Sequence, residues 1–181
     1  MNQILRNLSA ALLLVAPLAA CGSDEAGGAA GGAADARNES LAAALADADG
    51  LSRLSGSLNE TAMATIFDGT ASYTILAPTD AAFDEAALSP QEGESADAVL
   101  AAVLREHVLP GAFTVPDIAR ALENDGSVEM QNMGGTMLTF AREGDAIRVT
   151  DEDGGTALIT GDAIVASNGV AIPVDAMLKT P

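Results

Sequence analysis

The chain has 181 residues, with 26 Asp and Glu against eight Lys and Arg, so its formal net charge is −18. Such an acidic surface repels nucleic-acid phosphates and anionic lipid head groups, which excludes nucleic-acid binding as a function. The acidity favours solubility as its explanation, with attraction of basic partners or bridging by divalent cations as the alternative.

The first twenty residues have the composition of an export signal. A start containing Arg6 precedes thirteen mostly apolar residues over 8–20, which end in Leu18-Ala19-Ala20-Cys21. A helix of that length rises about 20 Å, too short for a hydrocarbon core of roughly 30 Å. Small residues directly before a cysteine resemble a bacterial lipoprotein signal. The resemblance implies a diacylglyceryl group on the sulfur of Cys21, cleavage before Cys21 and acylation of its new amine, with fatty-acyl chains such as palmitate. The alternative is ordinary secretion with a free thiol at Cys21. Because Cys21 is the only cysteine, no internal disulfide can form.

Residues 22–38 are rich in glycine and alanine and lack apolar periodicity, which predicts a flexible tether. We therefore expect a signal over 1–20, a lipidated cysteine with its tether over 21–39, and one domain over 40–181. Gly22-Ser23, without aspartate after the cysteine, resembles lipoproteins sorted to an outer membrane. The expected location is the bacterial cell envelope, at the outer membrane or cell surface rather than the inner membrane.

The domain is expected to begin with helices. Ser40 is a suitable cap for a helix that runs to Asp49 and ends at Gly50. Short helical turns are expected over 51–58 and again over 59–67.

A buried strand follows over 72–77, and Pro78 stops it. Thr79 or Asp80 then caps a brief helix that carries Phe83 toward the core.

The clearest helix is predicted from Ser95 to about His107, with Pro110-Gly111 closing the segment. Its apolar stripe consists of Ala96, Val99, Leu100, Val103, Leu104 and His107. A second helix is predicted after the cap Thr114, with Pro116 in its first turn and an apolar side of Ile118, Ala119 and Leu122.

From Ser127 onward, short apolar runs alternate with glycine-containing turns, the pattern of successive antiparallel hairpins. A last strand is expected over 170–174, after the tight turn of Asn168-Gly169, at an edge or closing position of the sheet. Helices first and strands afterwards predict an α+β domain.

Three stretches together resemble the fasciclin-type domain: TILAPTDAAF at 74–83, LREHVLPG at 104–111 and NGVAIPVDAML at 168–178. The resemblance covers about residues 40–180. It implies a fasciclin-like α+β fold, with helices of the N-terminal half packed on an antiparallel sheet or sandwich wedge from the C-terminal half. It also implies an extracellular or cell-surface interaction module, often adhesive.

The motif residues expected to shape this fold are Pro78, Thr79, Asp80, Phe83, His107, Gly111, Asn168, Gly169 and Asp175. Thr79 and Asp80 would supply oxygens to amides at a helix start, and Asp175 would bind backbone near the chain end. Two positions depart from the family: Glu106 stands where tyrosine is usual, and Ile172, followed by Pro173, stands where a second histidine is usual. Because the tyrosine is missing, the integrin contact linked with it in animal relatives is not carried over.

Catalysis, a cofactor and a metal site are all unexpected. His107 is the only histidine and lies on an apolar stripe, which predicts a packed, hydrogen-bonded core residue. The run Asp151–Gly155 superficially resembles a calcium loop, but its later positions lack the required ligands, so a hairpin turn is the better interpretation.

The sequence therefore predicts a lipid-anchored, non-enzymatic adhesion or interaction module whose protein or polysaccharide partner, such as matrix or biofilm polymer, it does not name. Two alternatives stay open: a periplasmic binding or scaffolding protein for an apolar ligand or an envelope partner, and a hydrolase.

Overall fold

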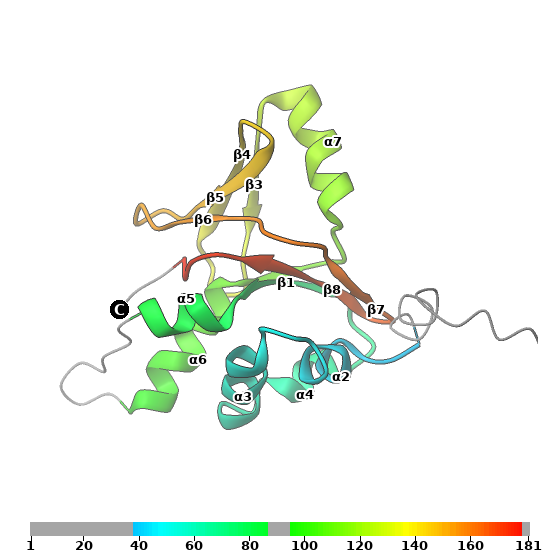
Figure 1. Ribbon diagram of the computed structural model, residues 1–181, viewed down its shortest axis with the longest axis vertical. Helices are drawn as coiled ribbons and strands as arrows, with labels where there is room; N and C mark the ends of the chain where they lie inside the picture. Colours follow the sequence, from blue (N-terminus) through cyan, green and yellow to red (C-terminus); the bar gives the residue numbers. More distant parts are fainter. Residues whose placement is uncertain (1–37, 87–94, 179–181) are drawn as a thin grey trace, which may run out of the picture.

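Two four-stranded sheets lie at the centre of the computed structural model, which describes residues 38–86 and 95–178. One has the strand order β2-β1-β8-β7 and the other the order β3-β4-β5-β6. The helices, labelled as in Figure 1, are α2 (Leu41–Ala46), α3 (Ser52–Glu60), α4 (Ala64–Phe67), α5 (Asp80–Glu85), α6 (Ala96–Glu106) and α7 (Val115–Asp125). The strands are β1 (Tyr73–Pro78), β2 (Val108–Pro110), β3 (Ser127–Gln131), β4 (Met137–Glu143), β5 (Ala146–Thr150), β6 (Thr156–Leu158), β7 (Ile164–Ala166) and β8 (Gly169–Val174).

The β2-β1-β8-β7 sheet is buried on both faces, with α2, α3 and α4 beneath it and the second sheet above it in Figure 1. Successive residues of β1 therefore belong to different cores. Ile75 and Ala77 pack in the core with the helices, whereas Leu76 packs in the core between the two sheets. This explains why β1 is a continuous apolar run instead of an alternating one.

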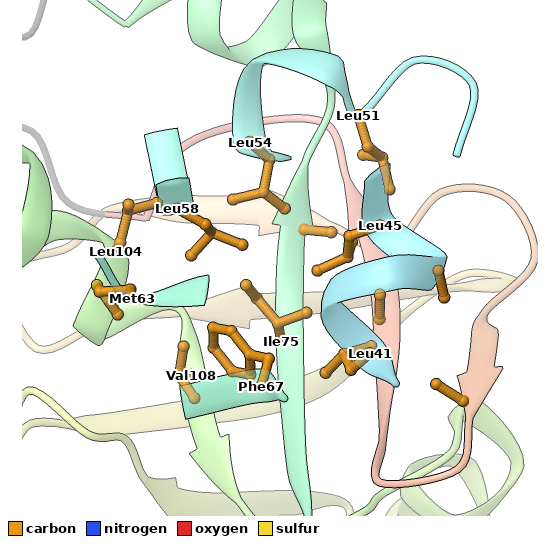
Figure 2. Packing of buried hydrophobic residues seen from close by; sticks show 14 residues of the cluster. Leu41, Leu45, Leu51, Leu54, Leu58, Met63, Phe67, Ile75, Leu104 and Val108 are labelled. Carbon is orange, nitrogen blue, oxygen red and sulfur yellow. The ribbon is translucent and has the colours of Figure 1, made fainter. Parts of the chain in front are cut away.

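Figure 2 shows the helical core, where Ile75 of β1 lies among leucines of α2 and α3. Phe67, at the end of α4, is fully buried beside it and meets the Tyr73 ring edge to face, with ring centroids 5.8 Å apart. The core between the two sheets is built from Phe140, Leu138 and other apolar residues, with α7 closing one side through Ile118 and Leu122.

The α+β class predicted from the sequence is confirmed, as are the hairpins β3-β4 and β4-β5. The sheets are not purely antiparallel, because β1 and β8 pair in parallel over their whole lengths. Of the two positions expected for residues 170–174, edge or closing, the edge position is wrong, since β8 lies between β1 and β7. The strand β2, only three residues long, was not predicted.

The helix boundaries also correct the prediction. The first helix ends at Ala46 rather than Asp49, because the chain turns there and brings Leu51 into the core, where it is 2% exposed. Ser95 caps α6 as expected, but Ala96 is exposed at the first turn and does not belong to the buried stripe.

Candidate functional site

The first sequence motif forms the junction between β1 and α5. Pro78 is the buried last residue of β1 and still pairs with Val174 of β8. Thr79 is the cap of α5, and its hydroxyl accepts a hydrogen bond from the amide of Ala82 at 3.4 Å. Phe83 packs against the helical core, as expected.

Asp80 caps a different helix from the one that it begins. Its Oδ1 accepts the amide of Arg53 and its Oδ2 accepts the hydroxyl of Ser52, both at 2.8 Å, at the first turn of α3. Its own amide donates to the carbonyl of Gly50 at 2.8 Å. The residue before α3 provides no side-chain cap. Asp80, which lies 27 residues after Arg53 in the sequence, therefore accepts a backbone amide at the start of α3 that would otherwise lack a partner.

This junction forms one wall of an open groove of about 790 Å³. We call it the Asp49–Asp162 groove; its lining residues are Ala48, Asp49, Gly50, Leu51, Thr79, Asp80, Ala81, Asp162, Ile164 and Pro173. The groove thus joins the α2–α3 connection, the start of α5, and the β7 and β8 strands. Its volume falls in the range of about 300–1,000 Å³ typical of ligand sites.

The groove combines apolar side chains with free carboxylates. Asp49 and Asp162 are both exposed, and within residues 38–86 and 95–178 neither forms a hydrogen bond or ion pair through its side chain. The neighbouring cation Arg53 is held by Asp84, with an Nη2 to Oδ1 distance of 2.5 Å. The groove therefore presents uncompensated negative charge to solvent.

His107 ends α6 and is fully buried. Its Nδ1 lies 2.9 Å from the carbonyl oxygen of Val103, which requires the proton on Nδ1, and its Nε2 accepts the amide of Leu178 at 3.0 Å. Burial lowers the pKa of His107 from 6.5 to about 4, although the Val103 hydrogen bond and the charge of Glu106 oppose the change. The predicted packed, hydrogen-bonded histidine is confirmed. With both nitrogens occupied and no exposure, it cannot serve as an acid or base for a bound substrate.

Gly111, also from the second motif, takes a φ of +106°, a conformation that favours glycine. Its amide donates to the carbonyl of Ser72 at 2.9 Å, and a β-carbon there would lie 3.0 Å from the Phe113 ring. The residue therefore closes the turn that follows β2.

Asn168 connects three segments with a single buried amide. Its Oδ1 accepts the amide of Leu41 at 2.7 Å, and its Nδ2 donates to the carbonyls of Phe67 and Gly69 at 2.6 and 2.8 Å. The start of α2, the end of α4 and the β7–β8 turn are thereby held together.

Gly169 and Asp175 fix the two ends of β8. A β-carbon on Gly169 would lie 2.3 Å from the carbonyl oxygen of Tyr73, so the parallel β1–β8 pairing leaves no room for a side chain. Asp175 Oδ1 accepts the amide of Leu158 at 2.7 Å, the expected bond from this carboxylate to backbone.

The comparisons with known proteins agree with this arrangement. The family described as the fasciclin domain matches residues 49–181. The chain belongs to the fasciclin family. The fold is also similar to that of a FAS1 domain pair from the insect cell adhesion molecule fasciclin I, with a TM-score of 0.57 and 19% sequence identity. That match covers 73% of this chain and 46% of the insect chain, so this protein spans about half the length of its structural relative. The fasciclin-like fold expected from the three motifs is therefore confirmed.

Glu106, which replaces the usual fasciclin tyrosine, has a buried role in this domain. It is 7% exposed, and its Oε2 accepts Nδ2 of Asn132 at 2.7 Å and the hydroxyl of Thr136. Gly134 lies so close that an added β-carbon would be 2.4 Å from the Glu106 carboxyl carbon. Glu106 thus holds the β3–β4 turn against the end of α6.

Ile172, at the position of the second fasciclin histidine, is fully buried between the two sheets. The following Pro173 is half-buried and lines the Asp49–Asp162 groove. Ile172 therefore adds an apolar side chain to the core between the sheets, and Pro173 adds an apolar surface to the groove.

The run Asp151–Gly155 is a turn between β5 and β6, as predicted. The amide of Gly155 donates to Asp151 Oδ1 at 2.6 Å, and the Asp151 amide donates to the Gly155 carbonyl at 2.9 Å. Within the described residues no group of three or more His, Cys, Asp or Glu side chains is placed to hold a metal ion.

Cys21, the preceding signal and the tether as far as residue 37 lie outside the described residues. In the part that is described, no helix is long and apolar enough to cross a membrane.

The groove has no local signature in the sequence, because its walls are far apart in the chain. Asp49 and Asp162 stand beside glycines in turns, and exposed turn aspartates are common without any binding role. The one signal was Asp80, which we assigned only to the helix that it begins.

Proposed function

We propose that this protein is a membrane-anchored, non-enzymatic adhesion module at the bacterial cell envelope, and that it binds its partner through the Asp49–Asp162 groove. The observation that carries the proposal is the groove itself, which is open to solvent and lies at the first fasciclin motif. The family consists of adhesion and interaction modules that are generally non-catalytic, in keeping with a histidine that is buried and fully bonded.

Anchoring through Cys21 would allow weak individual contacts to support adhesion. Many copies confined to one surface convert later binding events into local ones, so overall avidity exceeds the affinity of a single groove. The seventeen residues over 22–38 would span about 20–25 Å as a flexible chain, enough to hold the domain above lipid head groups. Such a display suits attachment to extracellular matrix or biofilm polymer.

The first test concerns the anchor. When the full chain is produced in a bacterium, mass spectrometry of the membrane fraction should find Cys21 as the first residue, carrying a diacylglyceryl group and acyl chains. Cys21→Ser should release the protein from the membrane, because the thiol that receives the lipid is gone. An unmodified thiol on freely secreted protein would contradict the anchor.

The same cells distinguish display from the periplasmic alternative. Protease added to intact cells should digest a surface-displayed domain, whereas protection would favour a binding or scaffolding role inside the envelope.

The second test concerns the groove. Ala81 is an exposed residue at the start of α5 and lines the groove, so Ala81→Phe should fill the groove without disturbing the core. Cells that display this variant should be retained about tenfold less on a matrix-protein-coated surface under flow, since avidity multiplies each lost contact.

Ala102→Phe is the matched control, because Ala102 is an exposed alanine of α6 outside the groove. Display levels should be equalised by quantitative blotting. Equal retention of the wild type and Ala81→Phe would show that adhesion does not use the groove.

A further inference from the structure

We propose that the Asp49–Asp162 groove recognises a protein segment in which basic side chains flank an apolar side chain. This inference rests on the proposed function and names the chemistry of the partner. The groove lining combines apolar side chains with three aspartates.

Much of the groove lining is apolar. Leu51, Ile164 and Pro173 contribute to it, together with the small side chains of Ala48 and Ala81. Leu51 is anchored in the helical core and Ile164 packs against that core, so these groups are held in place before any partner arrives. A partner side chain that fits here must be apolar to gain from the contact.

The lining also carries three carboxylates. Asp49 and Asp162 are exposed and unpaired among the described residues, and Asp80 adds a third carboxylate. Each Asp80 oxygen already accepts one hydrogen bond, yet an ionised carboxylate offers about four acceptor positions, so its charge remains available.

None of the ten lining residues is Lys, Arg or His. The nearby Arg53 is bound to Asp84. An anionic partner would therefore meet like charges in the groove, in addition to the formal charge of −18 on the whole chain, whereas Lys or Arg side chains would be attracted.

Hydrogen bonds fix the position of the groove walls. The Asp80 amide donates to Gly50 at 2.8 Å, the Thr79 amide to Val174 at 3.1 Å, and the Thr160 amide to Pro173 at 2.8 Å. Binding to such a preformed surface loses little conformational entropy on the side of the protein.

The experiment uses the purified full chain in neutral detergent and a fluorescein-labelled peptide whose centre is Lys-Leu-Lys between glycines. Two further peptides replace the centre by Lys-Ser-Lys or Glu-Leu-Glu. Binding is followed by fluorescence anisotropy, and amide chemical shifts locate the bound peptide. The Lys-Leu-Lys peptide should perturb Asp49, Gly50 and Ile164, whereas the Glu-Leu-Glu peptide should not bind.

The decisive variant is Asp49→Asn combined with Asp162→Asn, which should weaken binding of Lys-Leu-Lys about threefold to tenfold. The control is Glu129→Gln combined with Asp145→Asn, which changes the net charge equally; both carboxylates are exposed, one in β3 and the other in the β4–β5 turn. It should weaken binding less than about twofold at the same salt concentration.

Equal weakening by both double variants would overturn the inference, because binding would then follow net charge alone. Binding of Lys-Ser-Lys as tight as that of Lys-Leu-Lys would overturn it as well, since the apolar lining would play no part. If none of the lysine peptides bind but Ala81→Phe still lowers cell retention about tenfold, this partner chemistry is refuted while the proposed function stands.

Discussion

Replacing Asn168 by alanine is expected to lower the free energy of unfolding by about 3–5 kcal/mol, since two buried backbone groups and one part-buried group lose their partner. The side chain is only 9% exposed, and its bonds join residues about a hundred positions apart in the sequence. Urea unfolding of the full chain, followed by circular dichroism at neutral pH, measures the effect. A loss of this size is a large fraction of the 5–15 kcal/mol that is typical of a folded domain.

Asn59→Ala is the matched control. Asn59 is an exposed residue of α3 whose Nδ2 makes one local bond to the Ser55 carbonyl at 2.9 Å. Because water can replace that bond, the substitution should cost less than about 1 kcal/mol. If Asn168→Ala proved no more destabilising than Asn59→Ala, the three bonds of Asn168 would not contribute to stability as we describe.

The second large effect is a loss of stability at mildly acidic pH, caused by His107. Its pKa is about 4 in the folded protein, against 6.5 as the ordinary value that applies to the unfolded chain. Between these values the unfolded chain binds a proton that the folded protein does not, so stability falls as the pH falls. The contribution is fully present above pH 6.5 and declines toward pH 4, by about 3 kcal/mol in total.

The physical reason is that the imidazolium cannot accept the Leu178 amide at Nε2 and has no contact with water. Unfolding free energies measured by urea denaturation at several pH values from 7.5 to 4.5 should show the decline.

His107→Gln separates this effect from the titration of carboxylates. Glutamine does not titrate, so the variant should be less stable at pH 7.5 but should show a smaller decline as the pH falls. The many carboxylates remain in both proteins and cancel in the comparison. An equal decline in the wild type and His107→Gln would show that the proton is bound elsewhere.

His107 and Asn168 also show how much of a side chain's environment can be predicted from the sequence. His107 was recognised as a core residue because it lies four positions after Val103 on an apolar helical stripe. Asn168 was recognised only as a turn residue, since nothing local indicates that its amide reaches Leu41, Phe67 and Gly69. A side chain's near neighbours can be inferred from periodicity, whereas its distant partners depend on how the elements pack.

The same limit applies to the strands and the groove. Local patterns fixed the α7 helix, through Thr114 and Pro116, and the β3–β4 and β4–β5 hairpins, through their glycine turns, because propensity and turn chemistry act within a few residues. The parallel pairing of β8 with β1 was not predictable in this way, because it joins residues that are about a hundred positions apart.

Helix caps, the periodicity of apolar residues and the family motifs are local features of the sequence. The α+β class and the fasciclin resemblance followed from these features alone. Packing alone gave Asp80 its partners at the start of α3, buried Glu106 against the β3–β4 turn, and brought Asp49 and Asp162 into the lining of one groove. These contacts arise when two sheets and a layer of helices bury their apolar faces together. Contacts between residues that are distant in the sequence leave no local sequence pattern from which they could be predicted.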